Sequence, residues 1–446
     1  MSTENRASFG GKLSAILVAA GSAIGLGSIW RFPYLAGENG GAAFLLVYLL
    51  CVLIIAIPVM LCEFAIGRKT HKNAVGGFRE LSKPWQILGF NGILCALFIS
   101  GYYYVIAGWS LDYLVNSING SLYSSGIPFA EQYATFQASH WPIVYTIAFI
   151  LLTHFIIARG VEKGIEKASN VMMPILFIIL IFMAIRVAFM PGAAEGYRFF
   201  LTPDFKEAFS SDTLFQAAGQ AFFSLSVGMG CMITYASYFN EKTNLIGTSL
   251  SVSLLTLFVA TLAGLVIFPA VFSAGLQPTE GPSLIFITLP EIFKGMPLAL
   301  VWSAIFFILI ALAALTSTIS FHEVLTAYLS EEHKLSRKVA TYITTGITVV
   351  LSLVTLLVGF NIELFGRTFT STFDIYDFGS ANILLPLGGF FTCIFVGWFM
   401  KPDFFKNEIN NYGKLPVKIF PILFILVRYV APVIILYIFV KGLGII

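Results

Sequence analysis

The stretch GSAIGLGS (residues 21–28), continued by IWRFP (29–33), decides how this chain folds. It lies in an apolar segment, 13–36, that is long enough to cross a bilayer core, which takes roughly 20 helical residues. Each of its three glycines costs roughly 1 kcal/mol relative to alanine in a helix. Backbone groups freed in hydrocarbon must be buried in protein or line a cavity. The stretch predicts a helix broken at mid-membrane, where inverted-repeat transporters bind substrate; glycines that only allow close helix packing are the alternative.

The composition predicts a protein that crosses the membrane many times. Of 446 residues, 58% are hydrophobic and only 11% are charged, and the mean hydropathy is +0.87. Apolar stretches of spanning length predict eleven helices. They lie at 13–36, 42–67, 86–117, 141–158, 170–190, 214–239, 245–274, 298–329, 339–360, 376–400 and 417–440.

The distribution of lysine and arginine predicts the orientation. With the N-terminus inside, eighteen of these residues fall in inner segments and five in outer segments. We therefore expect a multi-pass protein of the cell (inner) membrane, with a cytoplasmic N-terminus and an extracellular or periplasmic C-terminus. The polar segment 1–12 does not resemble a cleaved signal peptide.

Metal and enzyme chemistry are not expected. The five cysteines all fall inside predicted spans and show no CxxC spacing, which is typical of buried apolar residues. No group of His, Asp or Cys with catalytic spacing occurs in the spans, so an enzyme is the least favoured class. We expect a small-molecule substrate and the lipid bilayer as partners and no nucleic acid; a homodimer stays open.

A second unusual span, GQAFFSLSVGMG (219–230), combines glycines and small hydroxyl residues at mid-depth. Breaks in the first and sixth spans imply two five-helix repeats and a binding site between them. The predicted fold is all-α, with a 5+5 inverted repeat and one extra helix. The predicted divisions are the cytoplasmic segment 1–12, the first repeat 13–190, an extracellular loop 191–213, the second repeat 214–400, and a cytoplasmic loop with the eleventh helix, 401–446.

These motifs resemble the neurotransmitter:sodium symporter family, especially its bacterial amino-acid transporters. The resemblance covers nearly the whole chain. Its motifs are GSAIGLGSIWRFPYLAGENGG (21–41), AIPVMLCEFAIGR (56–68), ISGYYYVIAGW (99–109), RGVEKGIEK (159–167), GQAFFSLSVGMG (219–230), TYASY (234–238), FITLPEIF (286–293) and ALAALTSTIS (311–320). The resemblance implies Na⁺-coupled import of a small substrate by alternating access.

The resemblance implies a second sodium site built from oxygen atoms. The family uses two carbonyls of the first helix break, one carbonyl of the eighth helix and two adjacent hydroxyls. The alternative is that these hydroxyls only bond to carbonyls of their own helix, as serine and threonine do. The matching positions are Gly21, Ile24, Ala313, Thr316 and Ser317.

The first sodium site of the family has weaker ligands here. Ser28 and Thr256 stand where relatives have side-chain amides, and a hydroxyl reaches less far than an amide carbonyl. We expect this sodium to be weak or absent, with a Na⁺ to substrate ratio nearer one than two. The matching positions are Ala23, Ser28, Ser224 and Thr256.

Chloride dependence stays open. Chloride-dependent members place an anion beside the first sodium site, and the shared part of that site is matched by Tyr48, Gln220 and Ser224. At the remaining positions, Ala260 and Thr256 supply neither the expected serine nor an acid.

The resemblance implies an amino-acid pocket. Amide groups at the end of a half-helix favour a carboxylate, and Gly25 stands where monoamine carriers have an aspartate. Tyr103 matches the family tyrosine that binds the carboxylate, and an apolar wall predicts neutral aliphatic or aromatic substrates. An aromatic cluster that only forms core is the alternative. The matching set is Ser22, Ala23, Gly25, Leu26, Gly27, Ile99, Tyr103, Phe223, Ser226, Met229, Ser317 and Phe321.

Two gates are implied around the pocket. Arg31 and Asp377 match an outer ion pair, and Arg6 and Glu331 match an inner pair with Tyr238 close by. Charges that are merely solvated are the alternative. An exposed pair contributes at most about 1 kcal/mol, which suits a latch that opens in each cycle.

Two other functions compete with Na⁺ symport. Glu63 is an acid inside the second span, where its family role is to hold N–H groups at a helix break. It could instead carry protons, with His322 and Glu323 of the eighth span, in an H⁺-coupled amino-acid transporter. The other alternative is an amino-acid receptor of the same fold that does not move its ligand.

Overall fold

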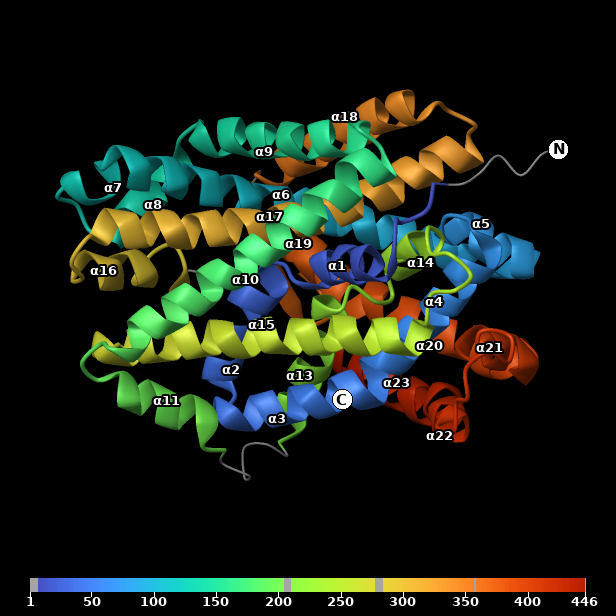
Figure 1. The fold of residues 1–446 in the computed structure, drawn as a ribbon. Coiled ribbons are helices and arrows are strands. Elements are labelled where there is room, and N and C mark those ends of the chain that lie inside the picture. Colours follow the sequence, from blue (N-terminus) through green and yellow to red (C-terminus); the bar gives the residue numbers. More distant parts are fainter. Residues whose placement is uncertain (1–6, 204–209, 277–283, 357, 446) are drawn as a thin grey trace.

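The chain forms a bundle of long helices that run side by side across the molecule (Figure 1). The computed structural model describes residues 7–203, 210–276, 284–356 and 358–445. Nine helical segments in these ranges are long and apolar enough to span a membrane, and a bent pair makes a tenth. They are Ala42–Thr70 (α3, α4), Lys83–Asn119 (mainly α6), Trp141–Ala158 (α9), Val161–Ala188 (mainly α10), Leu245–Ser273 (α15), Ala299–Glu332 (α17), Arg337–Thr355 (α18), Thr372–Phe399 (α19, α20) and Phe420–Gly442 (α22, α23).

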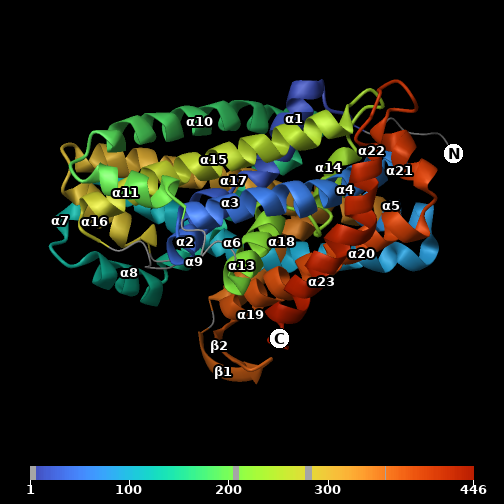
Figure 2. The ribbon, with the colours of Figure 1, turned by 90° about the horizontal axis from the view of Figure 1, so that it is seen from below.

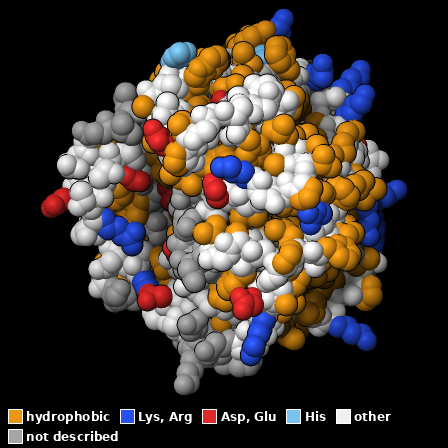
Figure 3. Space-filling view, turned by 90° about the vertical axis from the view of Figure 1, so that its left-hand side faces the viewer, with side chains coloured by type: hydrophobic (Ala, Val, Ile, Leu, Met, Phe, Trp, Pro, Cys, Tyr) orange, Lys and Arg blue, Asp and Glu red, His pale blue; other side chains and the backbone are white. Residues whose placement is uncertain are grey.

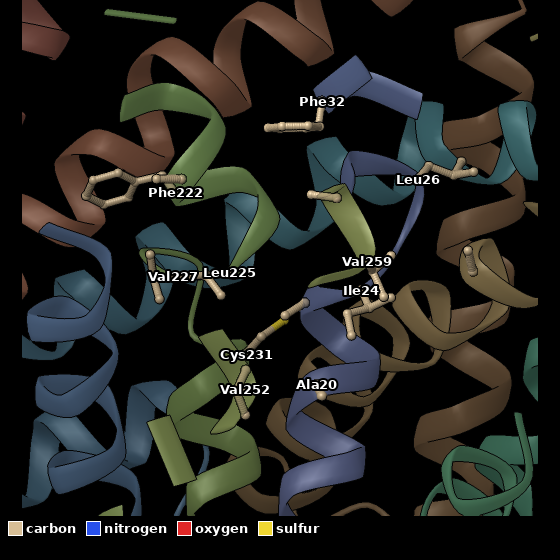
Figure 4. Close-up of a cluster of buried hydrophobic side chains, with 14 of the residues drawn as sticks. Ala20, Ile24, Leu26, Phe32, Phe222, Leu225, Val227, Cys231, Val252 and Val259 are labelled. Atoms are coloured by element: carbon tan, nitrogen blue, oxygen red, sulfur yellow. The ribbon is translucent and has the colours of Figure 1, made fainter. Parts of the chain in front are cut away.

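The first predicted span is broken, as its glycines indicate. Helix α1 (Lys12–Ala23) and the continuous turn-and-helix segment Gly27–Glu38, which ends in α2 (Phe32–Glu38), meet at an angle of 56°. The sixth predicted span consists of α13 (Ser211–Ser224) and α14 (Cys231–Ala236), joined by six non-helical residues. Figure 4 shows the two breaks close together: Ile24 and Leu26 belong to the first break, and Leu225 and Val227 belong to the second. Together with the spans given above, this sixth span confirms the predicted all-α membrane fold.

One predicted boundary is wrong, because the ninth span ends at Thr355 instead of residue 360. The apolar residues that follow belong to an antiparallel hairpin of β1 (Val358–Leu364) and β2 (Arg367–Ser371). Between the strands, Phe365 and Gly366 both have positive φ, as a tight hairpin turn requires.

Shorter helices cover the two ends of the bundle (Figures 1 and 2). One end, which we call the α8 end, carries α7 (Ser121–Ser124), α8 (Phe129–Ala138), α11 (Ala193–Leu201) and α16 (Thr288–Lys294). The other, the basic end, carries α5 (Ala74–Leu81) and α21 (Pro402–Ile409). Figure 3 views the α8 end, where acidic and basic side chains are scattered over a largely polar surface and hydrophobic side chains gather toward one side.

A buried ion pair joins three segments at the basic end. Arg68, at the end of α4, and Glu408, in α21, are 3% and 2% exposed and lie 2.7 Å apart. The guanidinium also donates to the Thr243 carbonyl and the Asn411 side chain, each at 2.7 Å. Since a buried charge is costly unless it is paired and fully hydrogen-bonded, this cluster fixes α21 against α4 and the segment after α14.

Candidate functional site

The break in the first span exposes backbone groups that other helices satisfy. The N–H of Leu26 donates to the hydroxyl of Tyr103, from α6, at 2.8 Å. The carbonyl of Ile24 accepts from the hydroxyl of Thr316, from α17, at 3.1 Å. Because buried backbone groups rarely lack partners, these contacts make the break possible.

The break in the sixth span depends on unusual backbone angles. Ser226, Gly228 and Gly230 all have positive φ, which is uncommon for the serine. The hydroxyl of Ser226 donates to the Ser22 carbonyl at 2.9 Å, so the two breaks bond to each other directly. Glu63 accepts a hydrogen bond from the N–H of Gly228, so this acid of α4 contacts the second break.

The breaks enclose a narrow central pocket with a cavity of ≈ 10 Å³. Eleven of the twelve residues predicted to bind substrate line this pocket, and none of its lining side chains is charged. The twelfth, Leu26, lines a wider cavity above it. Substitution of Gly25 would place a Cβ 2.0 Å from the Ser317 hydroxyl oxygen, so that side chain would have to move to make room. The eleven are Ser22, Ala23, Gly25, Gly27, Ile99, Tyr103, Phe223, Ser226, Met229, Ser317 and Phe321.

A vestibule with a cavity of ≈ 110 Å³ lies directly above the central pocket. Gly27, Tyr103 and Phe223 border both spaces, so the two rings separate them. Arg31 and Asp377 border the vestibule with their charged groups 3.8 Å apart, and the Arg31 guanidinium lies 4.8 Å from the centre of the Phe223 ring. The predicted outer pair therefore contacts Phe223, which together with Tyr103 forms a lid over the central pocket.

The sequence patterns missed four residues that line the vestibule. They are Trp30, Tyr34, Tyr102 and Phe373. A signal for two of them was present, because residues three or four apart share a helix face and residues 27, 30, 31 and 34 follow that spacing. Tyr102 and Phe373 come from α6 and α19, and only the tertiary structure brings them here.

Oxygen atoms gather where the second sodium site is predicted. The Thr316 hydroxyl lies 3.1 Å from the Ile24 carbonyl and 2.9 Å from the Ala313 carbonyl. Gly21 packs against Thr316, since an added Cβ would lie 3.5 Å from the threonine Cβ. Ser317 instead contacts the Ser22 carbonyl, at 3.4 Å. Thr316 therefore contacts a carbonyl of its own helix, Ala313, and also the Ile24 carbonyl at the first break. The first contact fits a hydroxyl that bonds within its helix, and the second fits a sodium ligand.

Only some of the residues of the predicted first sodium site contact one another. The Ser28 hydroxyl lies 3.4 Å from the Ala23 carbonyl, and the Thr256 hydroxyl donates to Val252 of its own helix at 2.9 Å. Ser224 bonds to the Tyr48 hydroxyl at 2.8 Å.

The three residues of the possible chloride site surround this region. Gln220 donates to the Gly27 carbonyl at 2.7 Å, and its side-chain oxygen is buried without a partner among the described residues. Tyr48 and Ser224 bond to each other, as described above.

The inner gate is described in part. Arg6 lies outside the described residues, and its predicted partner Glu331 accepts two hydrogen bonds from Asn73, at 2.8 and 2.9 Å. The Tyr238 hydroxyl donates to Glu323 at 2.6 Å. The Tyr238 carbonyl accepts from the N–H of Phe9 at 3.1 Å, and the two rings pack edge to face. Tyr238 therefore links the chain before α1 to α17.

The candidates for proton coupling have structural partners. Glu323 forms a salt bridge with Arg337 at 2.6 Å. The His322 ring lies 3.2 Å from the Tyr104 hydroxyl and 3.3 Å from the Thr345 hydroxyl, which joins three helices.

Comparisons with known proteins agree with this geometry. A model of the Sodium:neurotransmitter symporter family matches residues 6–126 and 132–445. An uncharacterized sodium-dependent transporter of Bacillus subtilis (strain 168), YhdH, is 36% identical over 100% of this chain and 99% of its own length. One of Haemophilus influenzae is also 36% identical, over 99% of this chain and all of its own. The crystal structure of MhsT in complex with L-phenylalanine has a TM-score of 0.90 and 39% identity, covering 98% of this chain and 100% of that one.

Proposed function

This chain belongs to the sodium:neurotransmitter symporter family, and on that premise we propose that it imports neutral, hydrophobic amino acids together with Na⁺ by alternating access. The family consists of transporters and not of enzymes, and its members use sodium. The finer proposal concerns the substrate, the ion sites and the orientation.

The charge-free lining of the central pocket is the observation that supports the substrate class. A cationic or acidic substrate side chain would enter the pocket without a counter-charge, which is costly in a buried site. Ile99, Phe223 and Phe321 offer apolar surface, and Met229 adapts its shape because it is unbranched. The similar protein MhsT has been crystallised with L-phenylalanine, a substrate of this class.

The amino-acid backbone would bind at the first break. Tyr103 holds its hydroxyl 2.8 Å from the Leu26 N–H, at the N-terminal side of a half-helix that favours negative charge. We propose that the substrate carboxylate shares these groups. Its ammonium group would meet carbonyls near Ala23 and Phe223, with the Ser226 hydroxyl close by.

Sodium would bind where Ile24, Ala313 and Thr316 place their oxygens, with Gly21 and Ser317 completing the site. An ion there would join α1 to α17 more firmly than one hydrogen bond does. We further propose that the first sodium site is weak, because Ser28 and Thr256 have short side chains and Thr256 bonds within its own helix.

Transport requires the lid and the gates to open in turn. We propose that the vestibule at the α8 end faces the outside and that the basic end faces the cytoplasm of an inner-membrane protein, as the positive-inside rule predicts. Phe223 closes over the substrate while Arg31 and Asp377 approach. Opening at the basic end then breaks the hydrogen bonds that Tyr238 and Glu331 form there.

The test is a thermal-shift screen of the twenty amino acids with purified protein, in Na⁺ and in choline. We expect leucine- or phenylalanine-like ligands to raise the unfolding temperature only with Na⁺. Uptake into proteoliposomes that persists at fixed pH when choline replaces Na⁺ would contradict sodium coupling and favour H⁺. Binding without counterflow of labelled substrate would favour a receptor.

A further inference from the structure

Another cavity lies at the α8 end, separate from the central pocket and the vestibule, with a volume of ≈ 700 Å³. It is half open and is bordered by the last turns of α6, the start of α9, and α7 and α8 between them, which lie together in both ribbon views (Figures 1 and 2). Its size falls within the range of small-molecule sites. It shares no residue with the central pocket or the vestibule.

A carboxylate is the only charged group that lines this cavity. Asp112 of α6 is 7% exposed, and its Oδ2 accepts one hydrogen bond, from Asn116 at 3.0 Å. Among the described residues, no Lys, Arg or His forms an ion pair with it. The segment 118–140, which covers the cavity, contains no Lys or Arg. A carboxylate buried without a cationic partner is costly, so its environment favours a cation.

The polar groups around Asp112 are oriented toward negative charge. The Asn116 amide donates to Asp112 at 3.0 Å, and the Ser121 hydroxyl lies 2.7 Å from the Asn116 oxygen and 2.6 Å from the Asn119 oxygen. The Asn116 amide occupies Oδ2 and leaves Oδ1 free to accept a hydrogen bond from a ligand. It also positions the carboxylate along the cavity wall.

Four aromatic residues also line the cavity, which lies at the ends of two candidate spans, Lys83–Asn119 and Trp141–Ala158. Tyr113, Phe136, Trp141 and Tyr145 line the cavity, and the Trp141 and Tyr145 rings pack 5.8 Å apart at the start of α9. Tryptophan and tyrosine rings attract organic cations over their faces and gather at membrane interfaces. A bare metal ion fits poorly, because the described residues hold no group of three His, Cys, Asp or Glu side chains.

We propose that this cavity binds the ammonium group of an organic amine, with Asp112 as its acceptor and Trp141 and Tyr145 against its alkyl part. The amine comes either from a soluble molecule or from a phosphatidylethanolamine headgroup at the membrane surface. The proposal does not depend on the transported substrate.

The test uses the full chain in dodecyl maltoside, with two probes. Ethanolamine is titrated by calorimetry, and phosphatidylethanolamine is added and detected by native mass spectrometry against phosphatidylglycerol. We expect saturable binding of at least one probe, and roughly 10- to 100-fold weaker binding by Asp112→Asn, since hydrogen bonds to charged groups are the stronger ones. Binding of ethanolamine alone identifies a soluble amine, and selective retention of phosphatidylethanolamine alone identifies the lipid.

Glu131→Gln is the matched control, because this exposed acid of α8 does not line the cavity. It should bind both probes like the wild type. The proposal is overturned if neither probe binds, or if Asp112→Asn binds as tightly as the wild type. If Asp112→Asn does not fold, Trp141→Ala decides. Its side chain is 48% exposed, so folding should tolerate the change, and binding weakened less than about twofold would overturn the proposal.

Discussion

Replacement of Gly25 by alanine tests whether the central pocket binds substrate. The new Cβ would lie 2.0 Å from the Ser317 hydroxyl oxygen, 2.5 Å from the Tyr103 hydroxyl and 3.1 Å from the Ser317 Cβ. Overpacking of this kind costs about 1–3 kcal/mol, and these groups are the ones proposed to meet the substrate. We expect amino-acid affinity to fall roughly 5- to 150-fold at saturating Na⁺. Equilibrium binding of the tightest amino acid from the screen measures it.

Two further variants separate a blocked pocket from a misfolded protein. Gly219→Ala in α13 is the matched control, because its Cβ would meet nothing within 4 Å; affinity should stay unchanged. Ser317→Ala in the Gly25→Ala background removes the closest clashing atom but also a hydroxyl proposed for the second sodium site. It should therefore recover part of the affinity only at raised Na⁺ concentration, and the Tyr103 contact keeps the recovery incomplete. Folded Gly25→Ala protein that binds within twofold of the wild type would refute the proposed position of the substrate.

Three more predictions address the pocket, the ion sites and stability. Tyr103→Phe, which removes the hydroxyl 2.8 Å from the Leu26 N–H, should weaken amino-acid binding about tenfold in the same assay while the protein stays folded. Ser28→Asn should lower the Na⁺ concentration for half-maximal binding about fivefold and raise the Hill coefficient, whereas unchanged Na⁺ dependence would contradict a first site limited by its short ligand. Arg68→Ala should lower the free energy of unfolding by about 3–5 kcal/mol, because it leaves a buried carboxylate unpaired; Lys72→Ala, from an ion pair 47% and 43% exposed, should change it by less than about 1 kcal/mol.

Helices were predictable because spanning length and apolar composition are local properties. The break at Gly21–Gly27 was visible for the same reason, since several glycines in one apolar segment conflict with a continuous helix. The end of the ninth span, by contrast, was not visible in the sequence. Its apolar run continues past Thr355, and only the pairing of β1 with β2 shows where the helix stops.

Contacts between distant parts of the chain could not be derived from patterns alone. Arg68 and Glu408 are 340 residues apart, and nothing near either residue indicates its partner. The eleven residues around the central pocket were grouped by resemblance to a family, because periodicity places each on a helix but does not state which helices meet. Asp112 carried no signal, since one acid near the end of a long apolar span is equally typical of a solvated helix end.

The contacts at the first break show how ligands could drive the transport cycle. Its backbone groups bond to three different elements: Leu26 to Tyr103 of α6, Ile24 to Thr316 of α17, and Ser22 to Ser226 of the second break. Any motion of one element relative to the others must break at least one of these bonds, and a buried group left unpaired costs about 1–3 kcal/mol. A sodium ion at the Ile24 carbonyl or a carboxylate at Tyr103 would supply a new partner to the same groups. Because a ligand shifts a conformational equilibrium only by its difference in affinity for the two states, these shared groups are where ion and substrate binding would couple to movement.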